Sequence, residues 1–172
     1  DPFCGSGTIA IEACLIAQNI APGFNRDFVS EEWNIMPPNI YDELRDEADR
    51  MADYDKEIEV YASDIDPEMV EIAKRNAEEV GLGDIIQFNV KDVNTLTIDS
   101  EGPVALVGNP PYGERIGDRE EVEEMYRYIG SLMKQHPYLS TYILTSNKEF
   151  EYLVNRKATK RRKLFNGYIE CT

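Results

Sequence analysis

Asn109, Pro110, Pro111 and Tyr112 form the stretch of the sequence whose residue types could most directly do chemistry. Two successive prolines fix φ and remove two N–H donors, so the carbonyls of Asn109 and Pro110 stay free to accept hydrogen bonds from a ligand. An amide oxygen, a backbone carbonyl and an aromatic ring on one stiff turn suit a planar ring that bears an amino group. The alternative interpretation is a proline-rich turn with a structural aromatic side chain, and the tetrapeptide alone does not decide between the two.

An apolar run, Val104 to Val107, comes just before this turn and has the length and β-branched content of a buried strand. The tetrapeptide is therefore expected at the carboxyl end of a strand, which is the edge where ligands bind in an open parallel α/β sheet. The segment that follows the turn, Gly113 to Asp118, is expected to be a loop able to move over a bound base.

A glycine-rich turn opens the chain, from Asp1 to Thr8, and an amphipathic helix follows it to about Gln18. Gly5 and Gly7 let the backbone approach a ligand closely, and the helix amino terminus favours an anionic or hydrogen-bond-accepting group. The strand that should feed such a turn is missing before Asp1, so we expect a piece of a longer protein, cut at or just before its cofactor loop. The turn also satisfies a loose dinucleotide fingerprint, but the acidic residue expected about 20 residues further on comes much later.

Two acidic residues follow the second expected strand, Ile58 to Ser63, and precede a helix expected from Pro67 to about Val80. An acidic residue at the end of this strand can accept hydrogen bonds from both hydroxyls of a ribose. Asp64 is our first candidate for that role and Asp66 the second. The alternative role of Asp66 is to cap the helix.

A third strand is expected from Ile85 to Val90, and Asp92 follows it. Asp92 could accept a hydrogen bond from an adenine amino group, and a simple turn aspartate is the competing interpretation. The remaining pattern predicts a helix at about 119–135, a strand at 141–145, a short helix at about 148–154, and a hairpin around the Asn-Gly pair at 166–167.

The segment from Ile20 to Glu57 is too long for an ordinary connection between a strand and a helix. We interpret it as a helical insertion within a single domain, with its helix near Asn39 to Tyr54. Trp33, the only tryptophan, is expected to pack this insertion against the body of the domain, and stacking on a substrate is the alternative.

The composition is that of one globular domain, with 172 residues of which 42% are hydrophobic and 30% charged. A net charge of −15 argues against binding nucleic acid by the overall field, so such a contact would be local or made by another domain. Six of the 18 basic residues lie between Arg156 and Lys163, and we interpret them as a solvated edge, with an RNA-facing patch as the alternative. Because there is no membrane-length apolar run and the three cysteines lack metal-ligand spacing, we expect a cytoplasmic protein with reduced thiols, no membrane contact and no metal.

Taken together, these features resemble the class I S-adenosylmethionine-dependent methyltransferases, which have a seven-stranded Rossmann-like α/β sheet with helices on both faces and an antiparallel last strand. The specific resemblance is to the RNA methylases of uncharacterised protein family 0020. Within that family it is to the bacterial large-subunit rRNA guanine-N2 methyltransferases that carry a THUMP domain. It spans essentially the whole chain, residues 1–172, and the ending from Lys163 to Gly167 is similar to that subgroup.

The resemblance implies S-adenosylmethionine as the cofactor and RNA, in particular rRNA, as the substrate, with RNA affinity supplied by a missing upstream domain. It implies that the target base meets Asn109, Pro110, Pro111 and Tyr112. The residues expected to contact the cofactor are Asp1, Phe3, Cys4, Gly5, Gly7, Thr8, Asp64, Ile65, Asp66, Asp92, Val93 and Asn109.

Other functions stay open from the residues alone. The same tetrapeptide serves any exocyclic amine, so adenine-N6 methylation of DNA or RNA is the nearest alternative. From a different class, the domain could be a non-catalytic RNA-binding module with a vestigial cofactor fold. A nicotinamide dehydrogenase fits less well, because it leaves the Asn109 to Tyr112 turn without a role.

Overall fold

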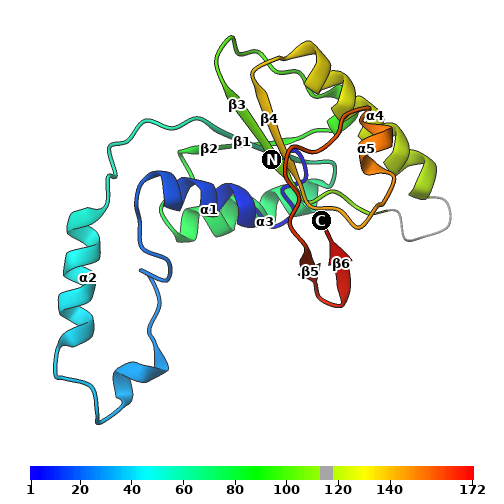
Figure 1. Cartoon of the computed structure of the whole chain (residues 1–172). Coiled ribbons are helices and arrows are strands. Elements are labelled where there is room, and N and C mark those ends of the chain that lie inside the picture. The colour runs from blue at the N-terminus through cyan, green and yellow to red at the C-terminus, as the bar shows by residue number, and fades with distance from the viewer. Residues whose placement is uncertain (113–117) are drawn as a thin grey trace.

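The computed structural model describes residues 1–112 and 118–172, so the loop expected at 113–118 lies almost wholly outside the described residues. Strands and helices alternate from Val60 to Leu153, as expected for an α/β fold (Figure 1). In chain order they are α1 (Thr8–Ala17), the 3-10 helix η1 (Val29–Glu32), α2 (Ile40–Met51), β1 (Val60–Asp64), α3 (Pro67–Glu79), β2 (Ile86–Val90), the 3-10 helix η2 (Val93–Thr95), β3 (Val104–Gly108), α4 (Asp118–Gln135), β4 (Leu139–Ile143), α5 (Phe150–Leu153), β5 (Leu164–Asn166) and β6 (Ile169–Cys171).

The described strands form three hydrogen-bonded pairs. β1 and β2 are parallel with Val60 opposite Ile86, β3 and β4 are parallel with Val104 opposite Leu139, and β5 and β6 form the expected antiparallel hairpin. Because β1 and β2 are parallel, and β3 and β4 likewise, the carboxyl ends within each pair meet at one edge.

Asp1 lies beside β1 and continues the pattern of a parallel ladder. Its carbonyl accepts a 2.8 Å hydrogen bond from the N–H of Ser63, and its amino group donates to the carbonyl of Tyr61, also at 2.8 Å. On its other side, a Cβ at Gly108 of β3 would lie 3.5 Å from Oδ1 of Asp1. The first residue of the chain therefore connects the β1–β2 pair to the β3–β4 pair.

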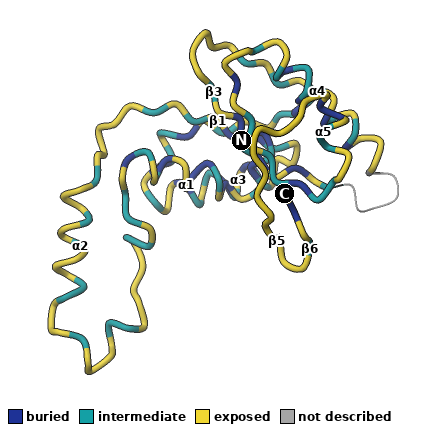
Figure 2. The backbone as a smooth tube through the Cα atoms, in the orientation of Figure 1, coloured by how far each residue is buried: buried dark blue, intermediate teal, exposed yellow. Residues whose placement is uncertain are grey.

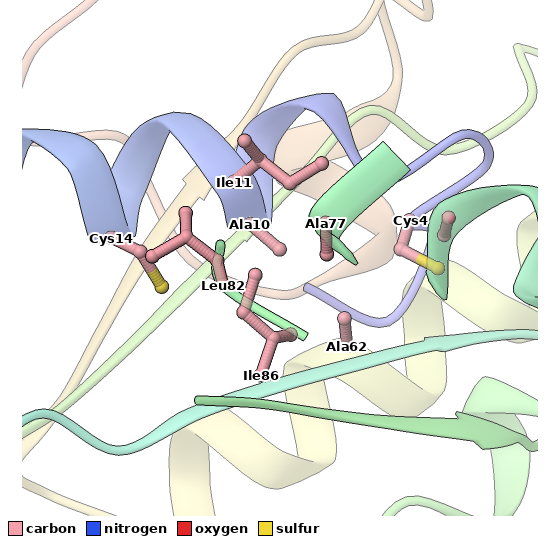
Figure 3. Close-up of a cluster of buried hydrophobic side chains, with 9 residues drawn as sticks. Cys4, Ala10, Ile11, Cys14, Ala62, Ala77, Leu82 and Ile86 are labelled. Carbon is pink, nitrogen blue, oxygen red and sulfur yellow. The ribbon is translucent and has the colours of Figure 1, made fainter. Parts of the chain in front are cut away.

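Helices α1 and α3 pack on the β1–β2 pair, and Figure 3 shows the apolar cluster between them. The α3 residues Val70, Ala73 and Ala77 are buried at the three- and four-residue spacing of one helix face. Asp66 caps α3 by accepting a 2.8 Å hydrogen bond from the N–H of Glu68, so the expected capping role is confirmed. Helix α3 is thereby fixed at the end of β1, where the acidic residues lie.

Helices α4 and α5 build the second part of the core, on the other side of the strands in Figure 1. The α4 side chains of Val122, Tyr126 and Ile129 are buried at helical spacing and pack with Leu153 of α5. None of the helices in the described ranges 1–112 and 118–172 is long and apolar enough to cross a membrane.

The insertion at 20–57 projects from the body as an arm that carries η1 and α2 (Figure 1). Neither helix has a buried residue, and Figure 2 shows the arm almost entirely in the colours of exposed and intermediate residues. Trp33 is 57% exposed, so the expectation that it packs the insertion against the body is wrong. The physical reason is that the arm is held by contacts within itself and at its base. Arg45 pairs with Glu31, and Gln18 donates a hydrogen bond to the carbonyl of Tyr54.

Candidate functional site

The candidate site lies at the carboxyl ends of β1, β2 and β3, where the glycine turn reaches both strand pairs. Asp64 ends β1, Asp92 follows β2 and Asn109 follows β3. The N–H of Lys91 donates a 2.9 Å hydrogen bond to the carbonyl of Asp64, which ties the first two ends together. Phe3 lies against the carboxyl end of β3, because a Cβ added at Gly108 would be 2.8 Å from its ring.

The two glycines of the first turn have different surroundings. Gly7 has a φ of +88°, and a Cβ there would lie 3.0 Å from Cβ of Ala73, so this glycine allows α1 to pack on α3. Gly5 has a φ of +50°, and a Cβ there would meet no atom within 4 Å. Gly5 is therefore the glycine that presents backbone to open space, as approach of a ligand requires.

The carboxylate of Asp64 is bonded by the backbone on both of its oxygens. Oδ2 accepts a 2.9 Å hydrogen bond from the N–H of Gly5, and Oδ1 accepts one of 3.0 Å from the N–H of Asp66. Each carboxylate oxygen has a second lone pair, so the side chain can still accept from a ribose hydroxyl. Between the two acids, Ile65 is 69% exposed and offers an apolar surface at the ligand edge.

The segment after β2 is organised by Asp92. Its Oδ1 accepts a 2.9 Å hydrogen bond from the N–H of Asn94 and so caps η2, as a turn aspartate does. Val93 is 6% exposed and its side chain belongs to the core, so only its backbone is available to a cofactor. Asp92 itself is half-buried, and among the residues that the structure describes its second carboxylate oxygen accepts no hydrogen bond.

Asp1 carries an unpaired buried oxygen next to the glycine turn. Its Oδ1 accepts a 3.0 Å hydrogen bond from the N–H of Phe3, whereas Oδ2 is buried with no partner among the described residues. A buried carboxylate oxygen without a donor is unfavourable, and a ligand that brings an ammonium or N–H group would satisfy it.

The Cys4 thiol is protonated at neutral pH. Burial, aided by the nearby Asp64 carboxylate, raises the pKa of Cys4 to about 11. Because the thiolate is the reactive form of cysteine, Cys4 is not placed to act as a nucleophile.

The Asn109 to Tyr112 turn is held by a chain of side-chain hydrogen bonds. The hydroxyl of Tyr112 donates to Oδ1 of Asn109 at 2.6 Å and accepts from Nδ2 of Asn166 at 3.2 Å. Pro110 is buried, whereas Asn109 is exposed at the edge of the strand. Burial raises the pKa of Tyr112, so its hydroxyl is neutral and able to donate at physiological pH.

A second network supports the same turn from beneath. The hydroxyl of Tyr126 lies 3.2 Å from the carbonyl of Pro111 and 3.0 Å from Oγ1 of Thr145, which in turn accepts from the N–H of Asn147. From the sequence, Tyr126 is expected only as a core residue and Asn166 only as part of a turn. Helical spacing reports the burial of a ring but says nothing about its hydroxyl, and no local signal links Asn166 to a residue 54 positions away.

The two cavities described in the structure lie elsewhere. One, of about 300 Å³, is at the amino ends of β3 and β4 and is lined by residues such as Val104 and Leu139. The other, of about 430 Å³, lies between α4 and α5. Within residues 1–112 and 118–172, no group of three His, Cys, Asp or Glu side chains could hold a metal ion.

A family model described as "UPF0020: RMKL-like, methyltransferase domain" matches residues 1–172. The chain is 56% identical over 170 residues to a Bacillus subtilis (strain 168) protein named "Putative RNA methyltransferase YpsC", with 99% of this chain and 44% of that protein covered. It is 41% identical over 176 residues to "Ribosomal RNA large subunit methyltransferase K/L" of Shewanella baltica (strain OS155), with 99% of this chain and 25% of that protein covered. The chain thus spans less than half the length of these relatives.

Solved structures of similar sequence are also named as methyltransferases or methylases. The crystal structure of SMU.472, "a putative methyltransferase complexed with SAH", matches with a TM-score of 0.93 and 43% identity over 99% of this chain and 45% of that chain. A structure of "a predicted N6-adenine-specific DNA methylase" from Listeria monocytogenes matches with a TM-score of 0.91 and 48% identity over 99% of this chain and 44% of that chain. These matches confirm the class I methyltransferase fold. Since the family model covers all 172 residues, the chain belongs to the UPF0020 family as an RMKL-like methyltransferase domain.

Proposed function

We propose that this chain is the catalytic domain of an S-adenosylmethionine-dependent RNA methyltransferase that methylates the exocyclic N2 amine of a guanine in large-subunit rRNA. The observation that carries the proposal is the Asn109 to Tyr112 turn at the end of β3, next to the glycine turn and Asp64. RNA as the substrate class is supported by the names of the relatives, one an RNA methyltransferase and one a large-subunit rRNA methyltransferase.

The residues at the strand ends fit S-adenosylmethionine, and a similar structure holds the related product SAH. Oδ2 of Asp1 would accept from the ammonium of the methionine part, and the open face of Gly5 gives room for that part to approach. Asp64 would hold the ribose, and Asp92 the adenine amino group, with the exposed Ile65 against the adenine ring. When bound, the cofactor supplies a methyl group on a positively charged sulfur.

The turn would activate the target amine by position. A guanine amino group is a poor nucleophile because its lone pair is delocalised into the ring. Oδ1 of Asn109 keeps one lone pair beside the hydrogen bond from Tyr112, and this lone pair and the carbonyl of Pro110 would accept the two amine hydrogens. Such contacts favour a pyramidal nitrogen whose lone pair points at the methyl group. Holding the reactants in this geometry can supply much of the barrier reduction without a covalent intermediate.

RNA binding would depend largely on another part of the protein. The net charge of −15 is unsuited to phosphate binding, and the relatives are more than twice the length of this chain. A base inside a helix would also have to be flipped out, at a cost of about a few kcal/mol.

The test is methyl transfer from labelled S-adenosylmethionine to large-subunit rRNA by the full-length protein. Asn109→Ala is expected to abolish most of the transfer, while binding of S-adenosylmethionine is still detected by calorimetry. Activity equal to the wild type would contradict the assigned site. A protein that binds no S-adenosylmethionine would instead support a non-catalytic RNA-binding module.

A second candidate is adenine-N6 methylation, favoured by the name of the similar Listeria monocytogenes structure. The same amine-binding turn serves both bases. Nucleoside analysis of the methylated product separates them, because our proposal yields N2-methylguanosine and the alternative yields N6-methyladenosine.

A further inference from the structure

We infer that Asn166, on the C-terminal hairpin, is a positioning residue that orients the amide of Asn109 through the hydroxyl of Tyr112. The inference rests on the proposed function and adds a residue that belongs to none of the strand-end segments. It connects a hairpin 54 residues further along the chain to the amine-binding turn.

The direction of each hydrogen bond in the chain follows from the chemistry of the hydroxyl. Tyr112 has one hydroxyl proton, and in the short 2.6 Å hydrogen bond this proton is donated to Oδ1 of Asn109. The Tyr112 oxygen can then only accept from Asn166, and the 3.2 Å contact comes from the Nδ2 donor of that residue. Because Nδ2 of Asn166 can only donate, it occupies one acceptor position of the hydroxyl oxygen and favours the orientation in which the hydroxyl proton points to Asn109.

This direction matters because the Asn109 amide has two ends. A hydroxyl that donates selects the rotamer in which Oδ1 faces Tyr112, and the remaining lone pair of Oδ1 is available to the target amine. If the hydroxyl were free to accept, the amide could turn its NH₂ group toward Tyr112 instead. Asn166 therefore biases the site toward a fixed acceptor, the group that an amine substrate needs.

The hairpin is anchored firmly enough to carry such a role. Thr145, which follows β4, and Thr172, which follows β6, exchange two backbone hydrogen bonds of 3.0 and 2.8 Å. Cys171 is 1% exposed and faces the core from β6. The Asn-Gly turn of the hairpin thus holds Asn166 at the end of a pinned strand, directly across from Ile169.

The experiment is a double-mutant cycle in the full-length protein, with Asn166→Ala, Tyr112→Phe and the double variant. Asn166→Ala is expected to lower kcat for methyl transfer about two- to tenfold, the effect of one neutral hydrogen bond, with the KM for S-adenosylmethionine unchanged. In the Tyr112→Phe background the same substitution should have no further effect, because the hydroxyl through which it acts is gone. If the factors by which the two single substitutions lower kcat multiply in the double variant, the inference is overturned and Asn166 is only a structural residue.

Asn166→Asp gives a sharper readout. The carboxylate has nearly the same shape but no N–H, and it would draw the Tyr112 proton away from Asn109. We expect its kcat to fall below that of Asn166→Ala, whereas a role in hairpin shape alone predicts a value nearer the wild type. Glu170→Gln is the matched control, since it removes the Lys163–Glu170 ion pair of the same hairpin without touching Tyr112.

A measurement independent of activity separates this inference from the proposed function. In protein labelled with ¹⁵N-asparagine, the side-chain NH₂ signals of Asn109 should shift in the same direction in Asn166→Ala and in Tyr112→Phe. Unchanged Asn109 signals in Asn166→Ala would overturn the inference even if Asn109→Ala is inactive. Shifted signals together with a fully active Asn109→Ala would instead contradict only the proposed function.

Discussion

The backbone N–H of Gly5 donates a 2.9 Å hydrogen bond to Oδ2 of Asp64, across 59 residues of sequence. Oδ1 of the same carboxylate accepts from the N–H of Asp66, so one side chain fixes both the glycine turn and the segment after β1. Asp64→Asn replaces one of these oxygens with an NH₂ group that faces a backbone donor. We expect the free energy of unfolding to fall by about 1–3 kcal/mol, and the affinity for S-adenosylmethionine to fall with it.

Chemical denaturation and calorimetric titration measure the two effects. Asp66→Asn is the control for the stability measurement, because asparagine caps a helix as well as aspartate and keeps the acceptor for the N–H of Glu68. If the free energy of unfolding fell equally in the two variants, the two hydrogen bonds to the Asp64 carboxylate would contribute no more to stability than the helix cap does.

Tyr126→Phe tests the network beneath the Asn109 to Tyr112 turn. Tyr126 is fully buried, and removal of its hydroxyl leaves the carbonyl of Pro111 and the hydroxyl of Thr145 without this partner. We expect a loss of about 1–2 kcal/mol in the free energy of unfolding, and a lower rate of methyl transfer because the turn is less fixed. Tyr152→Phe, at a side chain that is 84% exposed, should change neither quantity, and a similar loss there would refute the role of the network.

The local elements and the strand-end residues could be predicted from the sequence. The expected strand at 58–63 is β1 (Val60–Asp64), and the expected helix at 119–135 is α4 (Asp118–Gln135). These predictions hold because a helix or strand is indicated by the spacing of its apolar residues and by its capping and turn residues, all of which lie within a few positions of one another. The same local signals place Asp64 at the end of β1 and Asp92 and Asn109 after β2 and β3.

Contacts between distant segments could not be predicted. The hydrogen bond between Asn166 and Tyr112, and the tie between Asp64 and Gly5, depend on how the strands are arranged in space. The exposure of Trp33 on the arm could not be predicted for a related reason. A tryptophan favours burial on average, but no local pattern shows whether a body surface lies within reach of Trp33.

Substitutions in the arm should hardly affect the stability of the chain. Trp33 is 57% exposed, so Trp33→Ala is expected to change the free energy of unfolding by less than about 0.5 kcal/mol. Leu82→Ala, at a core side chain that is 1% exposed, should cost about 2–5 kcal/mol in the same denaturation experiment. A loss at Trp33 comparable with that at Leu82 would mean that the arm packs against the body after all.

The alternative interpretation of the basic segment between Arg156 and Lys163, an RNA-facing patch, predicts that its cations without an ion pair among the described residues contribute to RNA affinity. Arg161 is paired with Glu151, whereas Lys157 and Lys160 make no ion pair within the described parts of the chain. Replacing Lys157 and Lys160 by alanine in the full-length protein should weaken RNA binding and reduce the salt slope of the affinity by about one for each phosphate that is no longer neutralised. Arg161→Ala should reduce the salt slope less than the double substitution does. An unchanged salt slope in the double variant would show that the segment is a solvated edge.

Buried thiols should make the fold less stable in alkaline solution. Burial raises the pKa of Cys14, which is 0% exposed, from 9.0 to about 11. Because the folded state holds the proton more tightly than the unfolded chain does, this stabilisation is complete below pH 9 and is lost as the pH rises from about 9 to 11. Denaturation midpoints measured between pH 7 and 11 should therefore fall above pH 9.

In Cys14→Ala, which has no thiol to titrate at this position, the fall should be smaller, while the loss of packing lowers stability equally at every pH. An identical pH profile in the two proteins would show that the Cys14 thiol does not contribute to the alkaline transition.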